Sequence, residues 1–400
     1  MKATAPPGVL RVIGIFCLAQ TCAQLGAFAL PAILPELFEE WHITHADAGW
    51  LSGIFFAGYA LSVPFLVTLT DRVPARHVYA LAVVLTALSH LGMAFLASGF
   101  WSALGLRVAA GTGWAGTYMV GLKALTDEVS VELRSRAVAL HAASLGVSGA
   151  LSFALAGQMA AWVGWRFAFV VGAAGSFSAL AISTFLFPRR RPEPTDTRLL
   201  DFRPVLRNRT SMAYSIAYCA HTWEMFAVRS WAVTFLAFAA ARGGIVATWM
   251  APTLVATGME LLGTMTSVLG NEVALWMGRR RFVLTVMLLS TLVSLVAGLS
   301  SVWGYGFAAL TFLAYNAVIY ADSASLTAGA IEGALPGRRG ATLAVHATLG
   351  YGGGFIGPLA LGIILDAAGG NGVTGWGLGF AHIAIVMVLG SISLWRGGRS

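Results

Sequence analysis

The distribution of positive charge is the sequence feature that most constrains what this chain can fold into. Long apolar segments alternate along its 400 residues with short segments that contain Lys or Arg. Of the 25 Lys and Arg, 21 lie near an end of the chain or after an even-numbered apolar segment, and the exceptions are Arg107, Arg166, Arg229 and Arg242. This alternation is typical of membrane proteins, whose cytoplasmic loops are rich in Lys and Arg. The sequence therefore predicts a polytopic membrane protein with both termini in the cytoplasm, and topology rather than nucleic-acid binding explains the net charge of +8.

Composition supports the same class of protein. Hydrophobic residues make up 58% of the chain and charged residues 10%, against about 25% charged residues in soluble domains. Each apolar segment reaches the ~20 residues that a helix needs to cross the bilayer, and lipid cannot satisfy an open backbone. We therefore expect an all-α integral membrane protein with twelve transmembrane helices and an uncleaved first segment. The expected spans are 10–33, 46–69, 77–97, 100–122, 136–161, 166–187, 210–239, 245–269, 281–301, 303–330, 340–366 and 374–395.

One longer polar segment divides the chain. Residues 188–209 contain seven Arg and a cluster of prolines, a composition typical of a semi-extended linker. Its charge suits contact with anionic lipid on the cytoplasmic side. The sequence thus predicts an N-terminal six-helix bundle over 1–187, a basic linker over 188–209, and a C-terminal six-helix bundle over 210–400.

The two predicted bundles share a weak internal repeat. Glu128 precedes His141 by 13 residues, and Glu332 precedes His346 by 14, with two Arg between Glu and His in both segments. Repeats of this kind are typical of transporters built from duplicated halves. Chance similarity between two Ala-rich helices is the alternative.

The loop after the second expected span carries a more specific pattern. Asp71, Arg72 and Arg76 match the loop between helices 2 and 3 of the major facilitator superfamily, which this segment resembles, although Val67 and Pro74 occupy positions where that family prefers glycine. The resemblance implies two pseudo-symmetric six-helix bundles. We expect the three charged residues to form a conformational latch across the halves, the alternative being a helix cap with interfacial Arg side chains. The companion loop keeps the bases but has Leu275 where the acid would stand, which predicts a degenerate second latch.

A second resemblance lies in the fourth expected span. Arg107 followed by Gly111 and Gly113 resembles the helix 4 pattern that this superfamily associates with proton-coupled members, with Ala110 in place of the usual Gln. An Arg this deep in a span normally faces a cavity or a partner. The Gly-Pro signature of drug/proton antiporters is absent from the fifth span. A glycine-rich segment that ends at Pro358 lies instead in the eleventh span, where we expect it to bend the helix and admit close neighbours.

The seventh expected span contains the densest group of ionisable residues. His221 and Glu224 are three residues apart and share a helix face, whereas Arg229 points elsewhere. A carboxylate at this depth is costly unless it is protonated or paired, and Glu260 is a candidate partner. The resemblance implies that helices 1, 4, 7 and 10 line a central cavity, and most polar residues of the spans lie on these helices. The predicted substrate-binding residues are Gln20, Gln24, Arg107, Arg229 and Asn316, and the predicted proton-coupling residues are His221, Glu224, Glu260 and Asp322. A purely structural network is the alternative.

These patterns favour a secondary active transporter that works by alternating access and is driven by protons. Its substrate is expected to be a small inorganic or organic anion; efflux of a hydrophobic, drug-like compound and a transport-inactive sensor or assembly protein are the alternatives. No phosphate-binding loop typical of ATP-driven pumps is present, and no nucleophile–base arrangement indicates an enzyme. The three cysteines have no metal-ligand spacing. We expect a protein without cofactor or metal, acting as a monomer in a bacterial inner membrane.

Overall fold

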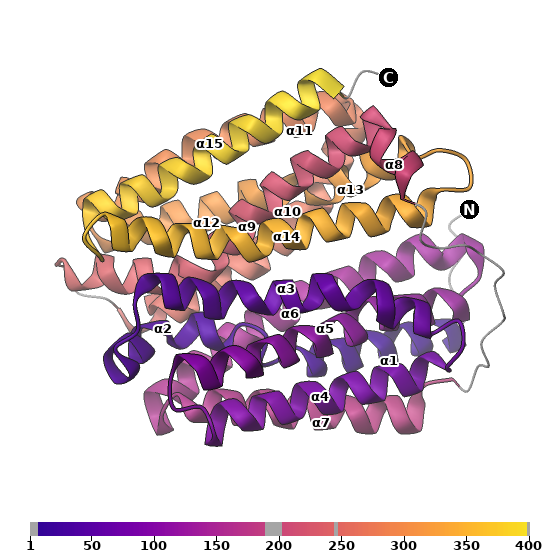
Figure 1. Cartoon of the computed structure of the whole chain (residues 1–400), viewed down its shortest axis with the longest axis horizontal. Helices are drawn as coiled ribbons and strands as arrows, with labels where there is room; N and C mark the ends of the chain where they lie inside the picture. The colour runs from indigo at the N-terminus through magenta and orange to yellow at the C-terminus, as the bar shows by residue number, and fades with distance from the viewer. Residues whose placement is uncertain (1–6, 189–201, 244–246, 398–400) are drawn as a thin grey trace. The chain divides into compact units, whose positions relative to one another are not determined.

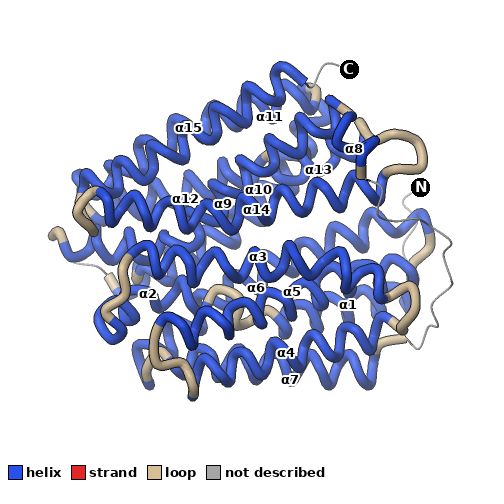
Figure 2. The backbone as a smooth tube through the Cα atoms, viewed as in Figure 1, coloured by secondary structure: helices blue, strands red, loops and turns tan. Residues whose placement is uncertain are grey.

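Helices form almost all of the structure (Figure 1). The computed structural model describes residues 7–188, 202–243 and 247–397. Figure 2 shows helices joined by loops, and this described part of the chain contains no strand. In chain order the elements are α1 (Pro7–Ala23), α2 (Ala29–Trp41), α3 (His45–Leu69), α4 (Ala75–Phe95), α5 (Phe100–Glu128), α6 (Val131–Val163), α7 (Arg166–Leu186), α8 (Arg203–Arg207), α9 (Arg209–Ala241), η1 (Thr248–Met250), α10 (Pro252–Met277), α11 (Arg279–Leu299), η2 (Ser300–Trp303), α12 (Tyr305–Ala321), α13 (Ser323–Glu332), α14 (Arg339–Ala367) and α15 (Val373–Gly397).

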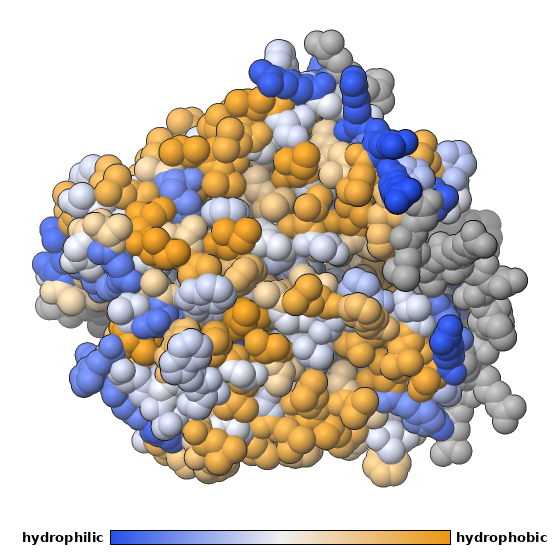
Figure 3. Space-filling model, viewed as in Figure 1, coloured by the Kyte–Doolittle hydropathy of each residue, from blue (hydrophilic) through white to orange (hydrophobic). Residues whose placement is uncertain are grey.

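The helices have the length and surface of membrane-spanning segments. Nine of them, within the described ranges, are long and apolar enough to cross a bilayer. Large apolar side chains point outward, including Phe65, which is 76% exposed, and Phe185, which is 81% exposed. Hydrophobic side chains also cover much of the face seen in Figure 3. A water-soluble protein would bury such side chains, so the prediction of an all-α integral membrane protein is confirmed. The count of twelve spans stays a prediction.

Two of the segments predicted as single spans are interrupted helices. The first breaks between α1 and α2, where Gly26 packs so tightly that a Cβ on it would lie 2.5 Å from the His90 ring. The other breaks between α12 and α13 at Asp322. Interrupted membrane helices free backbone groups and are tolerated where protein, not lipid, surrounds them. Both breaks lie close to residues predicted to have a function, namely Gln20 and Gln24 at the first and Asp322 at the second.

The chain divides into two compact units, each with its own core. Unit 1 comprises Met1–Leu30 and Gly58–Asp196, and unit 2 comprises Pro31–Ala57 and Thr197–Ser400. The segment Pro31–Ala57 therefore groups with the later helices, whereas the sequence assigned it to a bundle over 1–187. Most of the predicted linker lies outside the described residues; its last part forms α8 and begins α9. The predicted bundle boundaries remain a prediction.

Close helix approach at glycine and alanine organises unit 1. Helix α4 packs against α5 and α7, and α1 packs against α6 and α7. A Cβ on Gly113 of α5 would lie 2.8 Å from the backbone oxygen of Ala82 on α4, so only glycine admits this approach. Small residues are the usual means of bringing membrane helices together. The glycine run of the fourth span thus has a packing role.

Helix α9 forms the centre of unit 2. It packs against α10, α12, α13, α14 and α15, and most of its side chains are buried. Its neighbour α14 approaches through glycine: a Cβ on Gly353 would lie 2.3 Å from the oxygen of Cys219, and one on Gly357 would lie 2.4 Å from that of Trp223. The predicted packing role of the glycines in the eleventh span is therefore confirmed. Polar residues on α9 are consequently surrounded by protein.

Candidate functional site

The carboxylate of Glu224 lies in the middle of unit 2, on α9. It is fully buried, and its Oε1 accepts hydrogen bonds from Ser290 of α11 at 2.8 Å and from the hydroxyl of Tyr315 of α12 at 2.7 Å. Its Oε2 has no hydrogen-bond partner among the described residues. Two neutral donors on one oxygen satisfy only part of an ionised carboxylate. This arrangement can hold either a carboxylate or a carboxylic acid.

His221 lies one turn earlier on the same helix and contacts the break between α12 and α13. Its Nδ1 is 3.0 Å from Oδ1 of Asp322, and both side chains are buried, at 0% and 1% exposure. The contact has the distance of an ion pair but not the angles of a hydrogen bond. On the other side, the His221 ring stacks on Tyr218, with ring centroids 5.7 Å apart. The predicted proton-coupling residues His221 and Asp322 thus meet.

Arg229 pairs with Glu260 two turns farther along α9. Its Nη2 donates a short hydrogen bond to Oε2 of Glu260 on α10, and the hydroxyl of Tyr320 donates to the same oxygen at 3.4 Å. Both charged side chains are buried. The sequence offered Glu260 as a partner for Glu224, but the structure brings it to Arg229. Coulomb attraction explains the choice, because two carboxylates would repel each other while a guanidinium satisfies one.

Asn316 lies on α12, and its amide binds the backbone of α10. Its Nδ2 donates to the carbonyl oxygen of Met259 on α10, while its Oδ1 has no partner among the described residues. The amide therefore joins α12 to α10. A role in substrate binding stays a prediction for this residue.

The charges of this cluster do not all pair. If His221 is protonated it balances Asp322, and Arg229 balances Glu260. Glu224 is then left with hydroxyl donors alone. An ionised carboxylate buried without a cation is costly, so Glu224 is the member of the cluster best suited to bind and release a proton.

Unit 1 also contains buried polar side chains on α1 and α5. Gln20 lies in the last turn of α1 and Gln24 begins the break between α1 and α2, with 0% and 2% exposure. None of their four amide atoms has a hydrogen-bond partner in the described ranges. Arg107 on α5 is 2% exposed. Buried amides normally find partners, so these two are available to a ligand or to water.

The predicted latch residues lie at one end of unit 1. Oδ1 of Asp71 is 3.5 Å from Nζ of Lys123, which also lies 3.6 Å from Asp127. Arg72 is exposed and Arg76 is half-buried. The partner of Asp71 is therefore a lysine of the same unit that the sequence did not nominate for this contact. The latch itself stays a prediction.

The companion loop in unit 2 has a better-defined ion pair than its sequence indicated. Nε and Nη2 of Arg279 donate to the two carboxylate oxygens of Glu332 at 3.0 and 2.7 Å. Nη1 of Arg279 reaches Asn271 at 3.4 Å. The missing acid at Leu275 had suggested a degenerate site, but an acid from the end of α13 supplies the charge.

Three members of the unit 2 cluster have no sequence signal. Ser290, Tyr315 and Tyr320 reach the carboxylates from α11 and α12, with partners 60 to 91 residues away in sequence. No spacing rule connects such positions. Among the described residues no group of His, Cys, Asp or Glu could hold a metal ion, and the three cysteines are free and half-buried.

Comparison with known sequences gives one family. The model described as the Major Facilitator Superfamily matches residues 16–271, which is more than half of the chain. The niacin transporter NiaP of Acinetobacter baylyi is 26% identical over 140 residues, covering 35% of this chain and 32% of that protein. Human protein spinster homolog 1 is 21% identical over 240 residues, covering 56% of this chain and 45% of that protein. The matched segments thus span less than half of these relatives.

Solved structures resemble the whole chain. A bacterial homolog of the human lysosomal transporter Spinster, in an inward-facing and occupied conformation, has a TM-score of 0.81 and 16% identity, with 99% of this chain and 98% of that chain covered. The nucleoside transporter NupG has a TM-score of 0.76 and 12% identity, with 98% of this chain and 99% of that chain covered. At such identity the likeness concerns the fold.

Proposed function

Because this chain belongs to the Major Facilitator Superfamily, we propose that it is a proton-coupled secondary transporter that moves a small anion by alternating access. It is a membrane transporter by family, and the proposal concerns its driving ion and its substrate. The observation that supports the coupling is the buried carboxylate of Glu224, which two hydroxyl groups contact and which forms no ion pair within the described part of the chain.

Proton binding at Glu224 gives the coupling a physical basis. A buried charge without a counter-ion is stabilised when water reaches it and destabilised when water leaves. If hydration of the site changes during the transport cycle, Glu224 takes up a proton in one state and releases it in another. The imidazole of His221, one turn away, can exchange a proton with the same water. Asp322 and Glu260 have basic partners and are therefore less suited to this role.

Substitution of Glu224 by Gln tests the coupling. The amide keeps the shape of the side chain and cannot titrate. We expect Glu224→Gln to lose accumulation driven by a pH gradient in proteoliposomes, while exchange of preloaded substrate continues, because exchange requires no net proton release. Glu272→Gln is the matched control, since Glu272 is an exposed glutamate of α10. Unchanged pH-driven accumulation by Glu224→Gln would show that the residue is structural.

The choice of an anion as substrate depends mainly on unit 1. Arg229 contributes little net charge because Glu260 accepts its hydrogen bond. Arg107 is a second deeply buried basic residue, and the amides of Gln20 and Gln24, which have no hydrogen-bond partner among the described residues, offer further donors. A small organic solute also agrees with the similar proteins, which are named as niacin and nucleoside transporters.

Uptake assays with a panel of labelled organic and inorganic anions test the substrate class. We expect Arg107→Gln to abolish anion uptake, because loss of a charged contact to a bound ion costs on the order of 2–5 kcal/mol. The control is Arg166→Gln, since Arg166 is exposed and its guanidinium lies over the ring of Trp165. Transport of hydrophobic cations instead of anions would favour drug efflux, and no transport of any compound would favour the transport-inactive alternative.

The remaining parts of the proposal concern orientation in the membrane, the latch and the oligomeric state. We place both termini in the cytoplasm of a bacterial inner membrane, with the Arg-rich loops on that side. Asp71, Arg72 and Arg76 would then form a cytoplasmic latch in which Lys123 takes part. The transporter is proposed to act as a monomer.

A further inference from the structure

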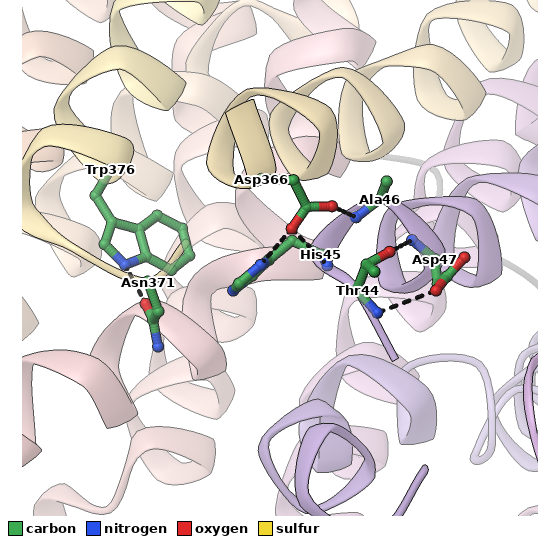
Figure 4. Close-up of polar contacts among 7 residues, drawn as sticks. All are labelled: Thr44, His45, Ala46, Asp47, Asp366, Asn371 and Trp376. Atoms are coloured by element: carbon green, nitrogen blue, oxygen red, sulfur yellow. Dashed lines mark hydrogen bonds and ion pairs between the residues drawn. The ribbon is translucent and has the colours of Figure 1, made fainter. Parts of the chain in front are cut away.

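A carboxylate from the end of α14 binds the beginning of α3 (Figure 4). Oδ1 of Asp366 accepts from the backbone nitrogen of His45 at 3.1 Å, and Oδ2 accepts from that of Ala46 at 2.8 Å. The same Oδ1 lies 2.7 Å from Nδ1 of His45. Three contacts thus join two segments that are 321 positions apart in the chain, both within unit 2.

The contact suits the electrostatics of α3. The first N–H groups of a helix have no partner within the helix and carry partial positive charge. Asp366 satisfies two of them at α3, although it lies in the last turn of its own helix, where a negative charge is unfavourable. Thr44 and Asp47 cap α3 as well: Thr44 N donates to Asp47 at 3.0 Å, and Asp47 N donates to the Thr44 hydroxyl at 3.1 Å. The Asp366 contact is therefore additional to a complete local cap.

Below this contact, α3 and α14 touch through glycine. A Cβ on Gly53 would lie 2.3 Å from the oxygen of Phe355, and one on Gly49 would lie 2.7 Å from that of Pro358. A Cβ on Gly362 would lie 2.2 Å from the oxygen of His45 itself. Glycine surfaces have few side chains that must repack when two helices separate. Side-chain contact between these helices includes the rings of Trp50 on α3 and Phe355 on α14, with centroids 5.4 Å apart. The polar contact at the end is thus well placed to decide whether the two helices stay together.

We propose that His45 and Asp366 form a pH-dependent clasp that holds the beginning of α3 on the end of α14 and is strengthened when His45 is protonated. An ionised Asp366 can only accept hydrogen bonds, so Nδ1 of His45 must carry a hydrogen. Neutral imidazole with its hydrogen on Nδ1 meets that need weakly, whereas imidazolium adds charge. Histidine side chains usually titrate between pH 5 and 8, above aspartate. Lower pH therefore favours the charged and stronger form of the clasp, and higher pH favours the neutral and weaker form.

His45 is partly open to solvent protons, and its ring contacts the carboxylate of Asp366. The His45 side chain is 17% exposed and that of Asp366 33%. The rings nearest His45 are uncharged, those of Phe38 on α2 and Trp231 on α9, with centroids 5.0 and 6.1 Å away. Acids stand at Asp366 on α14, at Asp47 on α3, and at Glu36, Glu39 and Glu40 on α2, and His42 lies between α2 and α3. On α9, Arg229 lies two residues before Trp231, but its charge is paired with Glu260.

Distance measurements between spin labels test the clasp without a transport assay. Labels are attached at Ile54→Cys on α3 and Ile363→Cys on α14, neither of which is buried, with Cys17, Cys22 and Cys219 replaced. Trp50 is left in place because its ring lies against Phe355 of α14. In substrate-free proteoliposomes we expect the ratio of short to long distances to rise roughly fivefold as pH falls from about 8 to about 5.5. His45→Asn should abolish this response, because its amide can still donate to Asp366 but cannot acquire charge.

Matched variants separate the clasp from general effects of pH. His42→Asn removes a neighbouring exposed histidine and should leave the response intact; asparagine tolerates the left-handed backbone of that residue, at φ 50°. Gly362→Ala should favour long distances at every pH, which checks that the labels report separation. A full pH response in His45→Asn, its loss in His42→Asn, or no response in the parent protein would overturn the clasp. Because no substrate is involved, these outcomes do not depend on the proposed transport activity.

Discussion

At the scale of single residues, buried charge most strongly determines which substitutions this protein tolerates. Arg229 and Glu260 form an ion pair inside unit 2, whereas the hydrogen-bond partners of the Glu224 side chain among the described residues are two hydroxyl groups. A buried ion pair adds little stability compared with apolar residues of the same size, but removal of one partner leaves an unpaired charge. The two acids should therefore respond differently to the same substitution.

Glu260→Gln is expected to destabilise the protein by about 3–5 kcal/mol, because Arg229 then remains buried without a counter-charge. Neutralising both residues, as Arg229→Met with Glu260→Gln, should recover most of the loss. Thermal unfolding of the purified protein in detergent measures both variants, and Glu224→Gln provides the comparison, with a small change expected. A double variant no more stable than Glu260→Gln alone would contradict the pairing.

The exposed ion pair of Arg279 and Glu332 should matter less for stability. The Glu332 side chain is 63% exposed, and surface pairs contribute about 1 kcal/mol or less. We expect Glu332→Gln to change the melting temperature little, whereas an effect on the rate of transport would identify the pair as part of the conformational cycle. Stopped-flow uptake at low and high salt checks this, since added salt weakens an exposed pair and should mimic the substitution.

At the scale of helices, glycine decides which neighbours can approach. Helix α14 presents glycine both to α9 and to the first half of α3. The same helix also contains Gly352, where an added Cβ would have no neighbouring atom within 4 Å. Some glycines of α14 thus permit close contact with a neighbouring helix and others do not, and substitution by alanine can distinguish the two kinds.

Gly357→Ala should destabilise unit 2 by about 1–3 kcal/mol, because the new methyl group overlaps the carbonyl oxygen of Trp223 and forces α14 away from α9. Gly352→Ala is the matched control and should leave the melting temperature unchanged or slightly raised, since alanine favours the helix. Thermal unfolding of the purified protein in detergent, followed by fluorescence, measures the melting temperature of both variants. Equal destabilisation by the two would mean that the close approach at Gly357 is not what alanine disturbs.

At the scale of the whole molecule, charge on the loops fixes the orientation in the membrane. The Arg-rich ends should face the cytoplasm, and the segment that contains the clasp should face the opposite side. In a background without cysteine, we expect Leu335→Cys to react with an impermeant maleimide only after the cells are opened, and Asn371→Cys to react in intact cells. Both positions are exposed. Reaction of both from one side would refute the predicted topology.

The sequence by itself determined the class, the family resemblance and many of the polar residues. Apolar segments of bilayer length can only become helices in lipid, and charge alternation along the chain orients them. A charged or amide side chain in such a segment is visible without a structure, because it is costly there. The sequence positions of Gln20, Arg107, Glu224 and Asp322 were therefore enough to identify them as polar residues within apolar segments.

Only the tertiary structure decided which of these residues meet. Glu260 pairs with Arg229 rather than Glu224, and Asp366 caps a helix that begins 321 residues earlier. The interrupted helices and the grouping of Pro31–Ala57 with unit 2 were likewise not readable from hydropathy. Hydropathy and spacing are properties of one segment, whereas the partner of a buried charge depends on which helix faces are brought together, and packing at a few glycines decides that.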